Sequence, residues 1–281
     1  MLRQHTVSAA VSLAGVGLHS GESVRATVQP AAADSGIVFV SMSGIEVPAH
    51  AMNVVDTTLA TTLGRDGWTV ATVEHLLAAL VCEEIDNARI VVDGGEVPAL
   101  DGSAKPWVDA LRAVGRTEQD APRRRIIVHT TIEVRDGDRV ARLMPAPHFE
   151  VAARVVFAHP TVGEQRLDLC LHNGTFGHEL AWARTFGFLH EVDYLRKSGL
   201  ARGGGLDNAV VYGPDGPLNP EGLRGDDEAV RHKMLDMVGD LALAGLPVVA
   251  RFEAELPGHA LNRRLVLALL ERTDCWELAV G

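Results

Sequence analysis

The feature that most constrains the fold is a pattern that occurs twice along the chain. In the first half, an apolar run with helical period starts at His75, the strand-like segment ARIVVDG follows, and Gly102-Ser-Ala leads into a second helix. In the second half, the same order runs from His232 through PVVARFEA to Gly258-His-Ala. The intervals from His75 to Gly102 and from His232 to Gly258 are 27 and 26 residues. This repeat predicts two domains of similar plan, with a natural site in the cleft between them.

Strand-like runs surround both copies of this pattern, so we expect an α+β fold. Two short extended runs open the chain, and ESVRATVQP, SGIVFVSM, DTTLATTL and WTVATV lead to the first helix. The second half starts with a hairpin around the turn dipeptide at 136–137, and the strand EVAARVVFAH follows it. The basic, Pro-containing stretch EQDAPRRR at 118–125 is the expected domain boundary. A helix-like run is expected around 177–184, and a Gly-rich loop after it.

The bulk properties exclude several function classes. A net charge of −11 and an aromatic content of 5% argue against a nucleic-acid-binding protein. No segment approaches the ~20 consecutive apolar residues of a membrane span, and the first residues lack the apolar core of a signal peptide. The cysteines are odd in number, with three in the chain, and none forms a CxxC pair. This argues against a disulfide framework or a cysteine metal site and fits a reducing compartment.

The helical segment RHKMLDMVGD, residues 231–240, carries an unusual polar stripe. His232, Asp236 and Asp240 fall within about 80° of arc on this helix. His232 and Asp236 lie one turn apart and can bind one ion together, and imidazole with carboxylate is a zinc-type ligand set. A third ligand must come from elsewhere, and His75, preceded by Glu74, is the candidate.

Plainer interpretations of the same residues remain open at this stage. His232 and Asp236 are equally consistent with a solvated helix pair worth a few tenths of a kcal/mol, and His75 with a capping or core histidine. His259 starts a helix after Pro-Gly, where a protonated imidazole is disfavoured unless a carboxylate such as Asp240 lies beside it. A GxSxG elbow, a phosphate-binding GxxxxGK[ST] loop and an HExxH helix are absent. The pattern therefore favours one metal held by three protein ligands with an open position.

Eight stretches together carry a resemblance to a known family, and they follow its motif order nearly end to end. The chain resembles the LpxC family of UDP-3-O-acyl-N-acetylglucosamine deacetylases, and RHKMLD and GHALN are its most specific motifs. The stretches are GVGLHSG (15–21), TVEHLLAAL (72–80), IDNARI (85–90), DGSA (101–104), ARTFGF (183–188), LDNAVV (206–211), RHKMLDMVGDL (231–241) and GHALN (258–262).

The resemblance implies a fold and an activity. The fold is two β-α-α-β domains, residues 1–120 and 126–281, whose helices are sandwiched between two sheets with the active site at the domain junction. The activity is zinc-dependent hydrolysis of the N-acetyl group of UDP-3-O-(3-hydroxyacyl)-N-acetylglucosamine, which releases acetate in the committed step of lipid A biosynthesis in Gram-negative bacteria. We therefore expect a cytoplasmic, monomeric hydrolase with one zinc ion per chain, no membrane span and no nucleic-acid partner.

The resemblance also assigns roles to residues of this chain. Glu74 would be the general base on the zinc-bound water, and His259 the general acid with Asp240 behind it. Thr185 would help to hold the oxyanion, and Lys233 would lie near the substrate. A carboxylate base and an imidazolium acid predict a bell-shaped pH–rate profile. The metal ligands would be His75, His232 and Asp236, and a hydrophobic insert at 186–212 would line an acyl-chain passage with Phe186, Phe188, Leu195 and Leu200.

Some expectations are less specific. Arg184 or Arg263 is a candidate for a diphosphate contact, and Phe157 for stacking on uracil. Thr61-Thr62 stands where some relatives carry a cysteine near the metal, so thiol-linked metal sensitivity is not expected here. Two other functions stay open: a zinc hydrolase of a different N-acyl sugar or peptide, and a non-catalytic metal-dependent binding protein.

Overall fold

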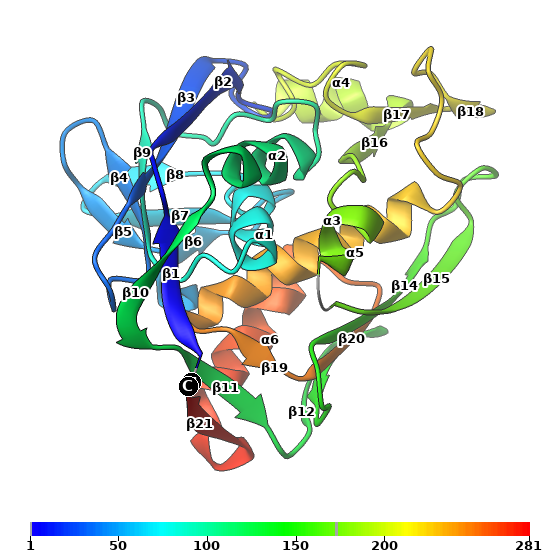
Figure 1. Cartoon of the computed structure of the whole chain (residues 1–281). Coiled ribbons are helices and arrows are strands. Elements are labelled where there is room, and N and C mark those ends of the chain that lie inside the picture. Colours follow the sequence, from blue (N-terminus) through cyan, green and yellow to red (C-terminus); the bar gives the residue numbers. More distant parts are fainter. Residues whose placement is uncertain (1, 172–173) are drawn as a thin grey trace.

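The structure is a computed structural model that describes residues 2–171 and 174–281. This part of the chain forms a mixed α+β fold with six α-helices and several sheets (Figure 1). The α+β class expected from the sequence is confirmed. Among the described residues, every helix is too short or too polar to cross a lipid bilayer.

The first half is built on a five-stranded sheet in the order β2-β3-β9-β4-β5. The pairs β2–β3, β3–β9 and β4–β5 are antiparallel, whereas β4 and β9 are parallel. Buried residues alternate with exposed or half-buried ones along β3, because one face of the sheet packs on the core. The strands are β2 (Val11–Val16), β3 (Ser23–Pro30), β4 (Ile37–Ser41), β5 (Glu46–Pro48) and β9 (Ala88–Val92).

The second half has a five-stranded sheet of the same plan, in the order β12-β13-β20-β14-β15. Its directions match those of the first sheet pair by pair, including one parallel pair, β14–β20. The repeat inferred from the sequence is therefore present in the sheet topology. The strands are β12 (Ile132–Asp136), β13 (Arg139–Met144), β14 (Glu150–Val156), β15 (Glu164–Cys170) and β20 (Arg251–Glu255).

Two helices accompany each of these sheets, one before its central strand and one after it. The first helices start at Glu74 and Glu228, and each second helix starts 31 residues later, at Lys105 and His259. Figure 1 shows α1, α5 and α6 with the strands of the two sheets on either side, and α2 next to α1. The helices are α1 (Glu74–Cys82), α2 (Lys105–Val114), α5 (Glu228–Leu241) and α6 (His259–Glu271).

The hydrophobic core is continuous between the two halves. One cluster of buried side chains contains Leu76 and Leu77 of α1 together with Met234, Leu235 and Val238 of α5. The first seven residues of α1 are all buried, including the polar Glu74 and His75 at its start. The polar stripe of α5 is buried as well, so its histidine and aspartates lie in the protein interior and not in solvent.

A small three-stranded sheet precedes α1 in the first half, and another precedes α5 in the second half. In the second half, β16 and β17 run parallel and α4 connects them, which makes the insert a small β-α-β unit. The remaining strands form the pair β1-β10 and the sheet β19-β11-β21. These elements are β6 (Val54–Asp56), β7 (Thr62–Arg65) and β8 (Trp68–Val70), then β16 (Phe186–Phe188), α4 (Leu189–Lys197), β17 (Val210–Gly213) and β18 (Gly216–Pro217).

Individual elements differ from the expectations in several places. The stretch 118–125, expected as the domain boundary, is mostly strand, since it lies in β10 (Arg116–Pro122), which pairs with β1, and in β11 (Arg124–Val128), which pairs with β21. The boundary itself stays a prediction. The helix expected at 177–184 is α3 (Thr175–Glu179), and the loop expected after it contains α4. The strand β15 was missed, because it is an edge strand with charged residues of the kind that discourage pairing with other chains. The other strands are β1 (Arg3–Val7), β19 (Val248–Val249) and β21 (Trp276–Val280).

Candidate metal centre

Three of the predicted residues meet at the crossing of α1 and α5. His75 Nε2 and His232 Nε2 lie 3.5 Å and 3.4 Å from the same Asp236 oxygen, Oδ1. One ligand atom from each of the three residues lies within 4.8 Å of the others. The imidazole rings of His75 and His232 pack in an edge-to-face arrangement, with their centroids 5.0 Å apart. The two halves of the chain therefore contribute to one compact cluster of metal-type donors.

A glycine on α5 allows this close approach of the two helices. A Cβ at Gly239 would lie 2.0 Å from the carbonyl oxygen of Glu74. Real Cβ atoms are not found so close to backbone, so α1 and α5 can touch here only because residue 239 has no side chain. The contact sets the first turn of α1, with Glu74 and His75, against the polar stripe of α5.

The solvated-pair interpretation of α5 is wrong. His232 and Asp236 are both only 2% exposed, and His75 is 6% exposed. Burial, the largest effect, lowers the pKa of His232 to about 3 despite the nearby Asp236 carboxylate. Burial alone would raise the pKa of Asp236, but His232 and Lys233 hold that pKa well below its ordinary value. A neutral imidazole beside an ionised carboxylate is the protonation state in which these groups bind a metal.

The hydrogen bonds leave the right atoms free for a cation. His232 Nδ1 lies 3.1 Å from the carbonyl oxygen of Ala183, which fixes the ring and directs Nε2 into the cluster. Asp236 Oδ1 is buried and has no hydrogen-bond partner among the described residues. A buried acceptor without a donor is costly, and a cation between Oδ1 and the two Nε2 atoms would satisfy it. The donor set therefore fits a metal ion.

Glu74 lies beside this cluster with its carboxylate buried. Its Oε2 accepts a hydrogen bond of 3.0 Å from the backbone N–H of Thr61. Its other oxygen, Oε1, lies 4.0 Å from His259 Nε2. Burial is the main influence on this carboxyl group and raises its pKa, although His259 and His75 oppose the change. A carboxylate with a raised pKa next to a metal site can accept a proton near neutral pH.

His259 opens α6 and is held by Asp240, as the sequence predicted. Its Nδ1 lies 2.9 Å from Asp240 Oδ2, and the same oxygen accepts a bond of 2.8 Å from Asn262. The hydroxyl of Thr61 donates to the other oxygen, Asp240 Oδ1, at 2.6 Å. Burial would lower the pKa of His259, but Asp240 and Glu74 outweigh it and raise that pKa to about 9. The imidazolium form is thus kept near neutral pH, with Nε2 directed toward Glu74 and Asp236.

A small cavity of about 20 Å³ opens at this cluster and brings in further side chains. Lys233 Nζ donates to Asp236 Oδ2 at 2.8 Å and lies 5.6 Å from the centre of the Phe186 ring. Thr185 is held by its backbone, which donates to Gly102 and accepts from Val210, both at 2.8 Å. The cavity lining consists of Leu18, His19, Leu59, Thr72, Glu74, His75, Thr185, His232, Lys233, Asp236 and His259.

Comparison with known proteins settles the family. Residues 4–271 match the family model described as "LpxC: UDP-3-O-acyl N-acetylglycosamine deacetylase". The chain belongs to the LpxC family. It is similar to the UDP-3-O-acyl-N-acetylglucosamine deacetylase of Phenylobacterium zucineum, with 52% identity over 98% of this chain and 96% of the relative. The deacetylase of the same name in Myxococcus xanthus is 48% identical over 98% of this chain and 88% of the relative, and that of Syntrophotalea carbinolica is 44% identical over 99% and 91%.

His19 and Thr61 of this LpxC chain lie at the site, although the sequence assigned neither of them a role there. His19 comes from the stretch GVGLHSG, which gave the family resemblance but no role for the histidine. Its Nε2 is buried and has no hydrogen-bond partner in the described part of the chain, and burial lowers the pKa of the imidazole. Glu96 fixes the loop by accepting from the backbone N–H groups of His19 and Ser20, both at 2.9 Å. Thr61 is the other, with hydrogen bonds to both Glu74 and Asp240.

The suggested diphosphate contact at Arg184 is wrong. The Arg184 side chain is only 2% exposed, and its guanidinium is bonded to the carboxylates of Glu228 and Glu221 and to the carbonyl oxygen of Gly222. The ion pair of Arg184 with Glu228 holds the segment around residue 184 against the start of α5. The adjacent residue, Thr185, lies at the site. Arg263 is half-buried on α6, and its Nε has no hydrogen-bond partner within residues 2–171 and 174–281.

The LpxC insert places an aromatic cluster next to the metal centre. Phe186 lies 6.2 Å from the His232 ring, and Phe188 and Phe157 pack against Phe186 behind it. Leu195 on α4 and Leu200 after it are half-buried, and none of the α4 side chains is fully buried. The stacking role of Phe157 on uracil stays a prediction.

Proposed function

We propose that this protein is a zinc-dependent deacetylase that hydrolyses the N-acetyl group of UDP-3-O-(3-hydroxyacyl)-N-acetylglucosamine and releases acetate. Family membership supports the substrate, and the relatives carry the name of this deacetylase. The observation that carries the chemistry is the buried His75–His232–Asp236 triad beside Glu74 and His259. Lipid A biosynthesis in the cytoplasm of a Gram-negative bacterium is the corresponding setting, and we infer that the protein acts there as a monomer.

The residues of the triad would hold one zinc ion. Two imidazoles and a carboxylate are a ligand set of catalytic zinc sites, which keep a fourth position open. Zinc bound there would lower the pKa of a water molecule toward ~7 and polarise the acetyl carbonyl. The protein supplies the other half of the chemistry through fixed acid and base groups.

Glu74 and His259 divide the proton transfers between them. Glu74 takes a proton from the attacking water, since its carboxylate is buried and has a raised pKa. His259 gives a proton to the departing sugar nitrogen, which leaves poorly as an anion, and Asp240 keeps the imidazole charged and oriented. In the course of one hydrolysis, the acetyl C–N bond breaks and a C–O bond to the water oxygen forms. The proton that Glu74 accepts restores the imidazolium of His259 after His259 has protonated the leaving nitrogen. The second hydrogen of the water leaves as a proton when the acetic acid product ionises to acetate.

Thr185 and Lys233 lie where the acyl oxygen develops charge. Both line the small cavity shared by the triad, Glu74 and His259. A hydroxyl and an ammonium directed at a developing oxyanion stabilise the transition state more than the ground state. We infer that Thr185 donates to this oxygen, and that Lys233 adds positive charge beside it.

The insert at 186–212 would guide the acyl chain to the site. Phe186 lies beside His232, and the cluster behind it offers apolar surface that stabilises a chain by about 0.8 kcal/mol per buried methylene. The passage residues of this proposal are Phe186, Phe188, Leu195 and Leu200. The matching sheet topologies support two β-α-α-β domains, 1–120 and 126–281, with the helices between the sheets and the site at their junction.

The acid–base pair argues against a non-catalytic metal-binding protein. A structural site closes its coordination and needs no carboxylate and imidazolium at 4.0 Å from each other. Hydrolysis of another N-acyl sugar or of a peptide would use the same residues, so the substrate rests on the family.

The decisive experiment measures acetate release and metal content together. Wild-type protein should contain about one zinc per chain and release acetate from the acylated UDP-sugar. Glu74→Gln should keep the metal and lose activity by 10²-fold or more, the usual contribution of a general base, whereas His75→Ala should lose the metal itself. Full zinc with no acetate release from any acylated sugar would overturn the proposal.

A further inference from the structure

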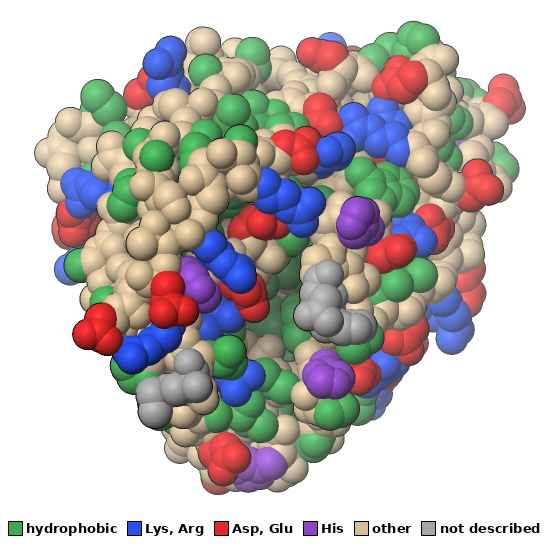
Figure 2. All heavy atoms as spheres, viewed as in Figure 1, with side chains coloured by type: hydrophobic (Ala, Val, Ile, Leu, Met, Phe, Trp, Pro, Cys, Tyr) green, Lys and Arg blue, Asp and Glu red, His purple; other side chains and the backbone are tan. Residues whose placement is uncertain are grey.

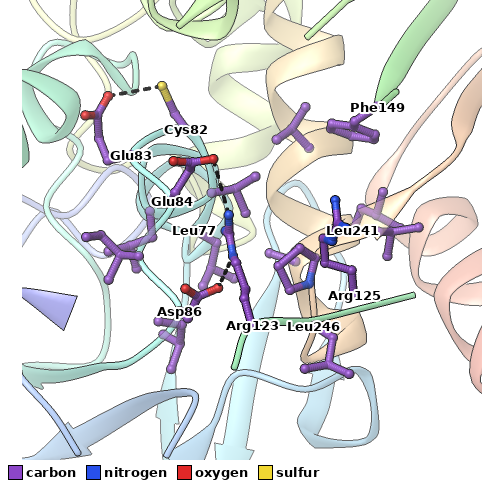
Figure 3. Close-up of a pocket in the computed structure, with 18 of the residues that line it drawn as sticks. Leu77, Cys82, Glu83, Glu84, Asp86, Arg123, Arg125, Phe149, Leu241 and Leu246 are labelled. Atoms are coloured by element: carbon purple, nitrogen blue, oxygen red, sulfur yellow. Dashed lines mark hydrogen bonds and ion pairs between the residues drawn. The ribbon is translucent and has the colours of Figure 1, made fainter. Parts of the chain in front are cut away.

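A second and much larger cavity lies away from the metal centre. Its volume is about 970 Å³, at the upper end of the range for small-molecule sites. Figure 2 shows the surface hollowed here, with charged side chains at the rim and apolar ones inside. Figure 3 draws the lining, which includes Leu77 of α1, Leu241 of α5, Leu246 and Phe149. Among the described residues, it shares no lining residue with the cavity at the candidate metal centre.

Five arginines line this cavity, and the charges of four are matched. Arg112 pairs with Glu83 at 2.9 Å, Arg116 with Glu84 at 2.5 Å, and Arg124 with Asp34 at 3.0 Å. Arg123 bonds to Asp86 at 2.8 Å and to Glu84 at 3.2 Å. The carboxylates on that side of the cavity are therefore already engaged by cations.

Arg125 is the exception. Its Nε is buried without a hydrogen-bond partner, and no described carboxylate forms an ion pair with its guanidinium. Figure 3 draws it on the side of Leu241 and Leu246, across the cavity from the Arg123–Glu84–Asp86 ion pairs. An unpaired cation partly withdrawn from water is costly unless an anion joins it.

We propose that this cavity is a second ligand site, for an amphipathic anion whose head group binds Arg125 and whose alkyl chain lies along the apolar lining. The apolar lining accounts for the chain, and Arg125, the one lining arginine without a carboxylate partner among the described residues, accounts for the head group. A carboxylate and a phosphate both fit a guanidinium through paired hydrogen bonds, so the shared chemistry is an alkyl anion.

The site is built on the two helices that carry the metal ligands. Leu77 and Cys82 face the cavity from α1, which has His75 in its first turn. Val238 and Leu241 do so from α5, beyond His232 and Asp236. A ligand in the cavity therefore packs against the far end of α1, about 10 Å along the helix from the metal centre.

The test places a reporter in the cavity wall. The variant Phe149→Trp adds a tryptophan to this cavity. The parent protein has four native tryptophans, so its own fluorescence change on adding ligand is subtracted, and the remaining change reports binding at this site. Titration with monomeric dodecanoate and, separately, dodecyl phosphate should give a saturable signal. Each methylene added from octanoate to dodecanoate should tighten binding about fourfold, and dodecanol, with the same chain and no charge, should bind at least about tenfold more weakly than the anions. Saturation by one anion only would identify the head group.

A matched pair of variants tests the role of Arg125. When it is combined with Phe149→Trp, Arg125→Gln should weaken binding of the anions by about tenfold or more. Arg124→Gln removes the same charge from the adjacent residue, which is already paired with Asp34, and should change affinity by less than about threefold. No saturable signal, dodecanol binding as tightly as dodecanoate, or equal effects of the two substitutions would overturn the proposal. The assay needs neither metal nor turnover, so its failure is distinct from failure of the deacetylase proposal.

Discussion

At the scale of single residues, Asp240 has the largest effect on the proposed chemistry, because it sets the position and the pKa of His259. It receives hydrogen bonds from Thr61 and Asn262 and holds His259 at 2.9 Å. Burial acts to lower the pKa of His259, and Asp240 is the largest of the influences that raise it to about 9. Since the acid must be protonated, activity is present below this pKa and lost as the pH rises through it.

Asp240→Asn should therefore move the alkaline limb of the pH–rate profile. Removing the carboxylate leaves burial as the main influence on His259, so its pKa falls and the limb shifts to lower pH. The profile of kcat/KM against pH measures the shift. Thr61→Ser keeps the hydroxyl on Asp240 and serves as the control, with the limb in its original place. An unchanged limb in Asp240→Asn would show that His259 is not the acid.

Cys82 should be a slow nucleophile. Burial, followed by the effect of Glu83, raises the pKa of this thiol to about 12. The reactive thiolate is thus a small fraction at pH 8 and grows about tenfold per pH unit. Peptide mapping after timed iodoacetamide treatment should show alkylation of Cys82 still accelerating above pH 9. A rate that levels off near pH 9 would contradict the assignment. Metal content should be unaffected, since Cys82 lines the other cavity.

The sequence predicted the site residues that recur at a regular spacing along a helix. His232, Asp236 and Asp240 recur at helical intervals, and the repeat pointed to His75 as their partner. Thr61 and His19 have no such signal, because they reach the site from loops that only tertiary packing places. Arg184 was misjudged because sequence shows a charge but not its partner, and here Glu228 binds it inside the protein.

At the scale of elements, the contact between α1 and α5 depends on Gly239. Gly239→Ala would put a Cβ 2.0 Å from the carbonyl oxygen of Glu74, so the helices must move apart. Overpacking of this kind costs about 1–3 kcal/mol of folding free energy, and it separates His75 from His232 and Asp236. We expect a lower unfolding midpoint in urea and weaker metal binding.

Gly187→Ala is the control for this substitution. A Cβ at Gly187 meets no atom of the described residues within 4 Å, and the backbone of Gly187 is not in the left-handed region. Its unfolding midpoint and metal affinity should stay close to wild type. If Gly239→Ala matched it in both measurements, the close contact of the two helices would not be what assembles the metal centre.

The elements that sequence patterns identified are those with a buried face. The apolar period of α1 and the alternation in β3 follow directly from burial, so both were expected. The edge strand β15 and the strand β10 carry charged residues, and α4 is half exposed, so their patterns resemble loops. Pairing with a neighbouring strand makes β10 a strand, and that partner, β1, lies more than a hundred residues away in the chain.

At the scale of the whole molecule, the two halves share both a core and the cluster of residues that could hold a metal ion. The buried cluster runs from α1 to α5 without a break, and His75 belongs to one half whereas His232 and Asp236 belong to the other. The repeat in the sequence predicted two similar units, but not that their apolar faces would merge. A metal ion bound by the triad would therefore join the halves as well as serve the chemistry.

Metal removal should lower the stability of both halves together. A ligand that binds only the folded state at 100 times its dissociation constant stabilises it by about 2.7 kcal/mol, which for a chain of this size corresponds to roughly 5–10 °C in the unfolding midpoint. Calorimetry of the chelated protein should show one transition at lower temperature, and zinc should restore it. His75→Ala should show no such response to zinc. Two separate transitions, only one of which shifts on chelation, would mean that the metal belongs to one half and that the helices do not couple the two.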